Sequence, residues 1–356
     1  MLFFKKKKDQ EEFEEKGKSK EVKKSVPKEK KERKQPTKPW GKKERVLVLV
    51  VLIFSVGTSA ILALSARSWK LPGLPKISLP TFKTKTIVIE KDKDSLTDRL
   101  SADEAVNLFR DKTRALSGVY GLYVIRLSNG FSYGYNEDDS FEPASLNKLP
   151  VMLSMYKTAE EGNINLQTIY KLKNPDKISG SGSLYSKPAG YELTYKDLVR
   201  LMGNQSDNTA FNIAKNILSQ RIIVETIQQL GMTNTEIFSE EQKTTPHDIG
   251  IFFQELMNAE VVSPASRDEI LEFLTKTTYE SWVAEGIPEH IRVAHKFGRE
   301  LHVVNDAGVV FASGPEGDEP FVLVILSKGV VESEADAVLP ELAKLIYEIE
   351  SSNEAY

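Results

Sequence analysis

Residues 46–66 form the feature that most constrains how this chain can fold. These 21 residues carry no charge and are almost all apolar, and a run of that length can cross a bilayer as one helix. Three basic residues, Lys42, Lys43 and Arg45, lie directly before it. Basic residues gather on the cytoplasmic side of membrane helices. The sequence therefore predicts a single transmembrane helix in the cell membrane, with a cytoplasmic N-terminus and the rest of the chain outside.

The residues before this run differ in composition from the rest. Residues 1–45 contain 18 Lys and Arg against 9 Asp and Glu, whereas the whole chain of 356 residues has a net charge of −3. So polar a segment buries too little apolar surface to fold, which predicts a disordered, basic cytoplasmic tail. Its lysines are interleaved with glutamates and lack an aromatic platform, so we predict no nucleic-acid binding. A cleavable signal peptide is the alternative to an uncleaved anchor, but the tail and the apolar run are both too long for one.

The part that follows divides into a linker and one folded domain. Residues 67–98 contain Pro72, Pro75 and Pro80 and predict an extended, extracytoplasmic linker. Residues 99–356 predict a domain whose first helix has Ser101 as its N-cap and buries Leu108 and Phe109.

Strand patterns occur at both ends of this domain and helical patterns lie between them. The strand-like segments, rich in β-branched and aromatic residues and separated by turn signals, are 118–127, 131–135, one starting at Ile291, 302–312 and 321–326. A last amphipathic helix covers 333–351. We therefore predict an α+β fold with a five-stranded antiparallel sheet, helices from the two ends of the domain flanking it, and an all-helical subdomain beside it.

Composition excludes several chemistries. The chain has no cysteine, so it has no disulfide, no thiol nucleophile and no thiolate zinc site. Its four histidines, His247, His290, His295 and His302, have no metal-ligand spacing, and we predict neither a metal nor a cofactor. No serine lies in a Gly-x-Ser-x-Gly elbow.

Ser145 and Lys148 lie three residues apart at the start of an apolar, helical pattern that continues through Met152 and Met155. Positions i and i+3 share one helix face, so the hydroxyl and the amine can meet. Serine is a weak nucleophile that needs a base within hydrogen-bond reach. Lysine serves as that base when burial leaves its amine neutral. Taken alone, a Ser-x-x-Lys spacing also arises by chance at an exposed helix terminus.

Two more short motifs follow Ser145-x-x-Lys148 along the chain, and their order makes the pattern specific. They are Ser206-Asp207-Asn208 and Lys296-Phe297-Gly298. The ordered set resembles the class A β-lactamases and penicillin-binding proteins, whose signature is Ser-x-x-Lys, Ser-Asp-Asn and Lys-Thr-Gly. The resemblance covers about residues 100–350, including flanking text such as Thr244-Thr245-Pro246.

The resemblance implies three catalytic residues. Ser145 would be the nucleophile, Lys148 its general base, and Ser206 the relay that delivers a proton to the leaving nitrogen. This division of roles agrees with the chemistry of amide cleavage, which needs a base at the nucleophile and an acid at the nitrogen.

It also implies four substrate-binding positions. Asn208 would contact substrate and Lys148, and Lys296 would face the substrate carboxylate from its strand beside Gly298. The backbone N–H groups of Ser145 and Arg299 would stabilise the oxyanion. A purely structural role is the alternative for some of these, since Asp207 and Asn208 equally suit a helix N-cap.

Two departures from the family pattern affect recognition and turnover. Phe297 stands where the family has Thr or Ser, and phenylalanine has no hydroxyl to hold a substrate carboxylate. The segment Gly231–Lys243 is short and lacks the Glu-x-x-Leu-Asn pattern whose glutamate activates the deacylating water. Glu236 or Glu240 is the candidate for that role, with a solvated charge cluster as the alternative.

The resemblance therefore implies a membrane-anchored, class A β-lactamase-like serine hydrolase that acts through an acyl-serine intermediate. Its expected substrate is a β-lactam or a related peptidoglycan amide, and the expected oligomeric state is a monomer. The alternatives are a penicillin-binding D-Ala-D-Ala peptidase and a non-catalytic cell-wall binding protein that has kept the fold.

Overall fold

A computed structural model describes residues 96–258, 260–314 and 317–352, with a few positions between 41 and 55. Nearly all of the predicted tail and linker, and most of the predicted transmembrane run, lie outside these residues. Val46, Val50 and Leu52 are helical and exposed. No helix within the described part of the chain is both long enough and apolar enough to cross a bilayer.

The sheet of the folded domain has five antiparallel strands, as predicted. They are β1 (Val119–Arg126), β2 (Ser132–Tyr135), β5 (Val293–Glu300), β6 (Val303–Val310) and β9 (Phe321–Lys328). Their order is β2-β1-β9-β6-β5, with every neighbouring pair antiparallel. The last three strands of the chain thus complete a sheet begun by the first two, and β5 forms one of its edges.

The central strand β9 is covered on both faces, which explains its unbroken apolar sequence. Successive side chains of a strand point to opposite faces. One hydrophobic cluster contains Phe321, Leu323 and Ile325, and the other contains Val322, Val324 and Leu326. The sheet therefore separates two cores.

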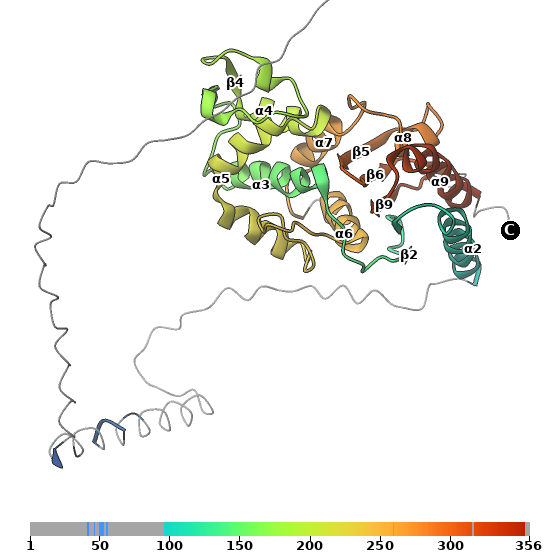
Figure 1. Cartoon of the computed structure of the whole chain (residues 1–356), viewed down its shortest axis with the longest axis horizontal. Coiled ribbons are helices and arrows are strands. Elements are labelled where there is room, and N and C mark those ends of the chain that lie inside the picture. Colours follow the sequence, from blue (N-terminus) through green and yellow to red (C-terminus); the bar gives the residue numbers. More distant parts are fainter. Residues whose placement is uncertain are drawn as a thin grey trace, which may run out of the picture. The chain divides into compact units, whose positions relative to one another are not determined.

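One core lies under the helices from the two ends of the domain, on one side of the sheet (Figure 1). These are α2 (Leu96–Thr113), α8 (Val283–Gly286) and α9 (Glu332–Ser352). Arg126 of β1 joins them, because its guanidinium pairs with Asp98 of α2 and Glu350 of α9. The Tyr133 hydroxyl donates a further bond to Glu350 at 2.8 Å.

The first helix differs from its prediction in two ways. It begins at Leu96, inside the predicted linker, so Ser101 lies within the helix and is not its N-cap. Leu108 is 39% exposed, whereas Phe109 is buried as predicted. The buried face of the helix contains Ala102, Ala105 and Phe109. Leu108 therefore lies just outside the buried face, to which the sequence had assigned it.

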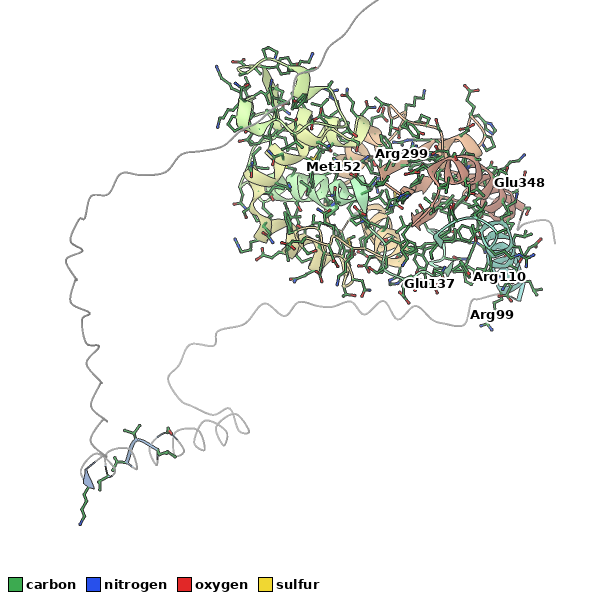
Figure 2. The ribbon with its side chains drawn as sticks, in the orientation of Figure 1. Arg99, Arg110, Glu137, Met152, Arg299 and Glu348 are labelled. Atoms are coloured by element: carbon green, nitrogen blue, oxygen red, sulfur yellow. The ribbon has the colours of Figure 1, made fainter. Side chains whose placement is uncertain are left out.

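The other core belongs to the helical subdomain (Figure 1). Its helices are α3 (Lys148–Glu160), α4 (Tyr195–Asn204), α5 (Asn208–Gln229), α6 (Pro246–Met257) and α7 (Pro264–Phe273). Met152 on α3 is fully buried in this part (Figure 2). The two predicted helices 209–218 and 221–230 form the single element α5, with a break at Ser219, where φ is 69°.

Several smaller elements lie between these helices and strands. The strands β3 (Ile169–Lys171) and β4 (Glu192–Thr194) pair with each other, and so do β7 (Ser313–Gly314) and β8 (Gly317–Asp318). Short 3₁₀ turns are η1 (Ala144–Asn147), η2 (Asn174–Asp176) and η3 (Leu184–Ser186). Strands of two or three residues are too short to show the alternation that predicts longer ones.

Candidate active site

Ser145 lies in the turn η1, which leads directly into α3. The residue before it, Ala144, has φ of 47°, a left-handed conformation that costs energy for a residue with a Cβ. The helix that follows is firmly anchored, since Leu149, Val151 and Met152 are all fully buried. A strained turn held by a buried helix fixes the position of the Ser145 hydroxyl.

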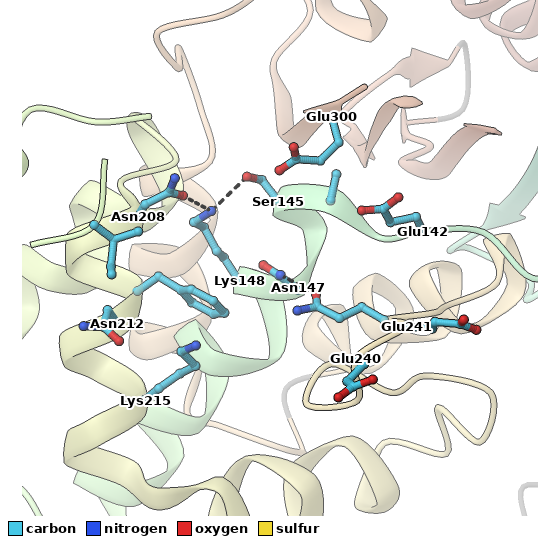
Figure 3. Close-up of a pocket in the computed structure, with 14 residues that line it drawn as sticks. Glu142, Ser145, Asn147, Lys148, Asn208, Asn212, Lys215, Glu240, Glu241 and Glu300 are labelled. Atoms are coloured by element: carbon cyan, nitrogen blue, oxygen red, sulfur yellow. Dashed lines mark hydrogen bonds between the residues drawn. The ribbon is translucent and has the colours of Figure 1, made fainter. Parts of the chain in front are cut away.

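Lys148 reaches back to this hydroxyl. Its Nζ donates hydrogen bonds to Ser145 Oγ at 2.8 Å and to Asn208 Oδ1 at 3.0 Å (Figure 3). Burial is the main influence on the amine and lowers the pKa of Lys148 to about 8, with a smaller lowering from Lys215; Asp207 and Glu300 act in the opposite direction. With that pKa, about one tenth of the amines are neutral at pH 7.

The turn between α4 and α5 brings Asn208 to this amine. Asp207 caps α5, because its Oδ1 accepts the Ala210 N–H at 2.9 Å. Asn208, the first residue of α5, directs its side chain to Lys148 instead. Asp207 therefore caps the helix, and its neighbour Asn208 contacts Lys148. The structural and the functional interpretation of this motif both apply, each to a different residue.

The glycine-rich run 180–183 packs against this turn. Asn208 donates from its backbone N–H to Ser181 O at 3.1 Å and from Nδ2 to Ser179 O at 3.0 Å. Gly182 has φ of 96°, and a Cβ there would lie 2.2 Å from Asp207 Oδ2. Only glycine lets the two segments approach so closely.

Ser206 lies in the same turn, but its hydroxyl does not join the network. The side chain is fully buried, φ is 55°, and Oγ has no hydrogen-bond partner among the described residues. The structure thus brings Lys148 and Asn208 to Ser145, while the predicted relay through Ser206 stays a prediction.

The edge strand β5 runs beside the nucleophile turn. A Cβ on Gly298 would lie 3.0 Å from the Ser145 backbone N and 2.8 Å from Leu146 Cδ1, so a glycine is required for this approach. His295 N donates outward to Leu274 O at 2.8 Å. Backbone groups alternate along a strand, which places the Arg299 N–H on the same outer edge.

Lys296 is fully buried and lies against its neighbour rather than in the cavity. Its Nζ donates to Phe297 O at 2.8 Å and lies 4.0 Å from the centroid of the Phe297 ring. Burial, followed by the charge of Lys148, lowers the pKa of Lys296 well below its ordinary value. The predicted partner of a substrate carboxylate is therefore a buried amine that is already bonded to a backbone carbonyl.

Arg299 and Phe297 face the α9 side of the sheet. Arg299 donates from both terminal nitrogens to Asp336, each at 2.9 Å, so its guanidinium is engaged away from Ser145. The Phe297 ring centroid lies 5.5 Å from that of Tyr279 and 6.5 Å from that of Trp282. An aromatic cluster thus occupies the place where the family pattern has a hydroxyl.

A second buried cluster lies on that side of β5. His295 is fully buried, with Nδ1 2.8 Å from Asp306 Oδ1 and Nε2 3.2 Å from Glu280 Oε1. Burial alone would lower the pKa of His295, but Asp306 and Glu280 outweigh it and raise the pKa to about 9. Asp306 Oδ2 also accepts the Val283 N–H at 3.0 Å. The cluster therefore binds the segment around α8 to the sheet.

Ser145 opens into a cavity of about 560 Å³. The charged residues that line it are Glu142, Lys148, Lys215, Glu240, Glu241 and Glu300 (Figure 3). Glu236 is outside this lining, and its Oε1 pairs with Lys243 Nζ at 3.0 Å. Sequence reasoning missed Glu300 and Lys215. Glu300 is two residues after Gly298 on a strand, so alternation alone would have placed it on the nucleophile's face.

No group of three or more acidic or histidine side chains within the described part of the chain is placed to hold a metal ion.

Comparison with known proteins gives a consistent set of similarities. Residues 101–349 match the model of the family described as "Beta-lactamase enzyme family". Beta-lactamase L2 of Stenotrophomonas maltophilia is 24% identical over 65% of this chain and 81% of that protein. Beta-lactamase CARB-4 of Pseudomonas aeruginosa is 22% identical over 67% of this chain and 87% of that protein.

Solved structures share the architecture. A β-lactamase from Sphaerobacter thermophilus has a TM-score of 0.64 and 25% identity over 71% of this chain and 97% of its own. A mutant of PBP-A in an acyl-enzyme complex with penicillin G has a TM-score of 0.64 and 24% identity over 70% of this chain and 96% of its own. The fold is that of β-lactamases and of PBP-A.

Proposed function

Because the chain belongs to the β-lactamase enzyme family, we propose that it forms an acyl-enzyme at Ser145 with a β-lactam or a related cell-wall amide. The observation that carries this proposal is the 2.8 Å contact between Lys148 Nζ and Ser145 Oγ. A buried amine with a lowered pKa, held at the nucleophile, is what a serine needs to become reactive. The relatives support the same substrate class, since two of them are β-lactamases and a mutant of PBP-A forms an acyl-enzyme with penicillin G.

Acylation would begin from the neutral form of Lys148. The amine accepts the Ser145 hydroxyl proton while Oγ attacks the carbonyl carbon. The Ser145 and Arg299 N–H groups are the candidates that stabilise the resulting oxyanion. The carbon–nitrogen bond then breaks, and the leaving nitrogen takes up the proton held by Lys148, with Ser206 as the candidate relay. The product is an ester at Ser145.

Hydrolysis of that ester is the less supported step. The segment 231–243 lacks the family's glutamate pattern, and Glu236 is paired with Lys243. Glu240 lines the cavity and is the remaining carboxylate of the two that the sequence suggested. We therefore propose that the acyl-enzyme is long-lived. Phe297 also favours a second candidate, a cell-wall binding protein that kept the fold without turnover, because its ring stands where the family binds the substrate carboxylate.

We further propose that residues 46–66 anchor the protein in the cell membrane with residues 99–356 outside. The support is the uncharged, apolar run and the basic residues before it. A protease added to intact cells should then remove the folded domain. Protection of the domain in intact cells, followed by digestion after lysis, would reverse the orientation.

The enzymatic proposal is tested on the full chain in detergent with a fluorescent penicillin and a chromogenic cephalosporin. We expect a persistent covalent label on the Ser145 peptide, lost in Ser145→Ala, and slow colour change. Rapid colour change would mean efficient deacylation and a true β-lactamase. A label that persists in Ser145→Ala would remove Ser145 as the nucleophile, and absence of any label would favour the binding protein.

A further inference from the structure

The resemblance assigns the Lys296 amine to a substrate carboxylate, and Arg299 is the other cation on the same strand. Lys296 is buried against Phe297, and its amine is bonded to the Phe297 carbonyl. Arg299 is held by two hydrogen bonds to Asp336. Neither side chain lines the cavity at Ser145. Both cations are therefore already bonded to groups of the protein.

Glu300 is placed beside the nucleophile instead. It is the last residue of β5, and strand alternation puts its side chain on the face of Gly298, whose Cα lies against the Ser145 amide. Its carboxylate lies next to the Ser145 side chain in the close-up (Figure 3), and the residue is exposed to the cavity. No ion pair within the described ranges engages it.

Four of the six charged residues around the cavity are acidic. Glu142, Glu240 and Glu241 also line it, against the amines of Lys148 and Lys215. At close range, the Glu300 carboxylate would repel an anionic substrate group and attract a cationic one. The lining thus selects the opposite charge from the one that the family signature is built to bind.

Resting on the proposed acylation, we propose that Glu300 is a specificity-determining residue that selects an acyl donor with a cationic group near its scissile carbonyl. The cation would pair with the Glu300 carboxylate while the carbonyl carbon lies at Ser145 Oγ. Candidate donors are amides or esters of amino-substituted acids, in contrast to acyl donors that are recognised through a carboxylate.

The position of Glu300 also couples substrate binding to the protonation of Lys148, the proposed general base. Glu300 favours the protonated form of Lys148 and so raises its pKa. A substrate cation that neutralises Glu300 removes this effect and increases the fraction of neutral amine. The preferred substrate thereby promotes its own attack, whereas an uncharged analogue does not.

The test uses two activated esters of matched shape on the full chain in detergent. One is the p-nitrophenyl ester of γ-trimethylammonio-butyric acid, and the other is its uncharged isostere, with a tert-butyl group in place of the trimethylammonium. Acylation is followed by p-nitrophenol release, and the rate in Ser145→Ala is subtracted as background. We expect the cationic ester to react about tenfold faster, which corresponds to one modest charge interaction.

Glu300→Gln should reduce this ratio to about twofold or less and should move the pH midpoint of acylation to lower pH. The matched control is Glu225→Gln, the same change of charge on the exposed surface of α5, which should keep both the ratio and the midpoint. A ratio near one in the native chain, or a ratio that survives Glu300→Gln, overturns the assignment while leaving acylation at Ser145 intact. Absence of Ser145-dependent release with either ester overturns the inference, and the proposed function falls with it only if the fluorescent penicillin also fails to label Ser145.

Discussion

The two sides of the cavity follow the family pattern to different extents. On the α3 side, Ser145, Lys148 and Asn208 form a connected set with bonds of 2.8 and 3.0 Å. On the β5 side, Phe297 replaces a hydroxyl and covers Lys296. The groups that we propose attack a carbonyl are therefore assembled, while the amine that the family pattern assigns to a substrate carboxylate is bonded elsewhere.

This difference separates reactivity from recognition. Reactivity depends on one packed turn and the helix behind it, so a local motif preserves it. Recognition depends on which side chains an edge strand presents to the cavity, and a single aromatic substitution changes that. The predictions below test whether the two sides are in fact independent.

The largest expected effect is on the α3 side. Lys148→Met fills the buried space but removes the base, and we expect the rate of Ser145 acylation to fall on the order of 10³-fold. In the native chain the rate should rise with pH through about 8, as the buried Lys148 loses its proton. Both are measured by the rate of covalent labelling as a function of pH. Lys157→Met, on the same helix, is the control; labelling that survives in Lys148→Met would mean that another group activates Ser145.

The next effect concerns the stability of the β5 side. Asp306→Asn takes away the strongest partner of the buried His295 and weakens the contact with the Val283 N–H. Breaking a buried charge pair costs about 3 kcal/mol or more, measured by denaturant unfolding at pH 6. Glu280→Gln should cost less, because the Glu280 side chain is 43% exposed. Equal stability of Asp306→Asn and the native chain would show that this cluster does not hold the strand.

The same cluster gives a pH dependence whose sign is fixed. The pKa of His295 is raised above its ordinary value of 6.5 to about 9 in the folded chain. Its contribution to stability is therefore complete below pH 6.5 and is lost as the pH rises through about 9. The free energy of unfolding should fall over that interval in the native chain, and this fall should be smaller in His295→Gln. An identical decline in both proteins would assign it to other groups.

The sequence predicted the sheet and the contact between Ser145 and Lys148 because both depend on local patterns. Alternation located the strands, and the i, i+3 spacing located the contact between Ser145 and Lys148. The directions of the side chains at the sheet edge could not be predicted from the sequence, because they depend on packing between segments that are distant in the chain. Phe297 packs against Tyr279 and Trp282, and the Arg299 guanidinium is held by Asp336 of α9.

Ser206 and Glu300 show in two ways that a sequence motif does not determine the surroundings of a side chain. The Ser206 motif was found, but the motif does not show that Ser206 has φ of 55° or that its hydroxyl has no hydrogen-bond partner among the described residues. Glu300 belongs to no motif and was missed, although strand alternation from Gly298 would have identified its face. Motifs locate residues, whereas the surrounding fold decides what those residues contact.

A smaller effect is expected on the recognition side. Phe297→Thr removes the ring from Lys296 and restores a hydroxyl near the cavity, so the amine gains water and charge. We expect acylation by penicillin G, which carries a carboxylate, to increase about tenfold. Phe311→Thr is the control for loss of a partly buried aromatic ring outside the site. No increase in Phe297→Thr would mean that the ring is not what keeps Lys296 from the substrate.

The smallest expected effect is that of Lys296→Met on penicillin G acylation. It tests whether the two sides of the cavity are independent, because it is compared between the native chain and the Phe297→Thr variant. In the native chain Lys296 is covered by Phe297, so Lys296→Met should lower penicillin G acylation by no more than about threefold. In the Phe297→Thr background the uncovered amine should bind the carboxylate, and the same substitution should cost about tenfold more. Labelling rates of the four proteins give this coupling. If Lys296→Met is equally harmful in both backgrounds, Lys296 acts through Lys148 rather than through the substrate, and the two sides of the cavity are one unit.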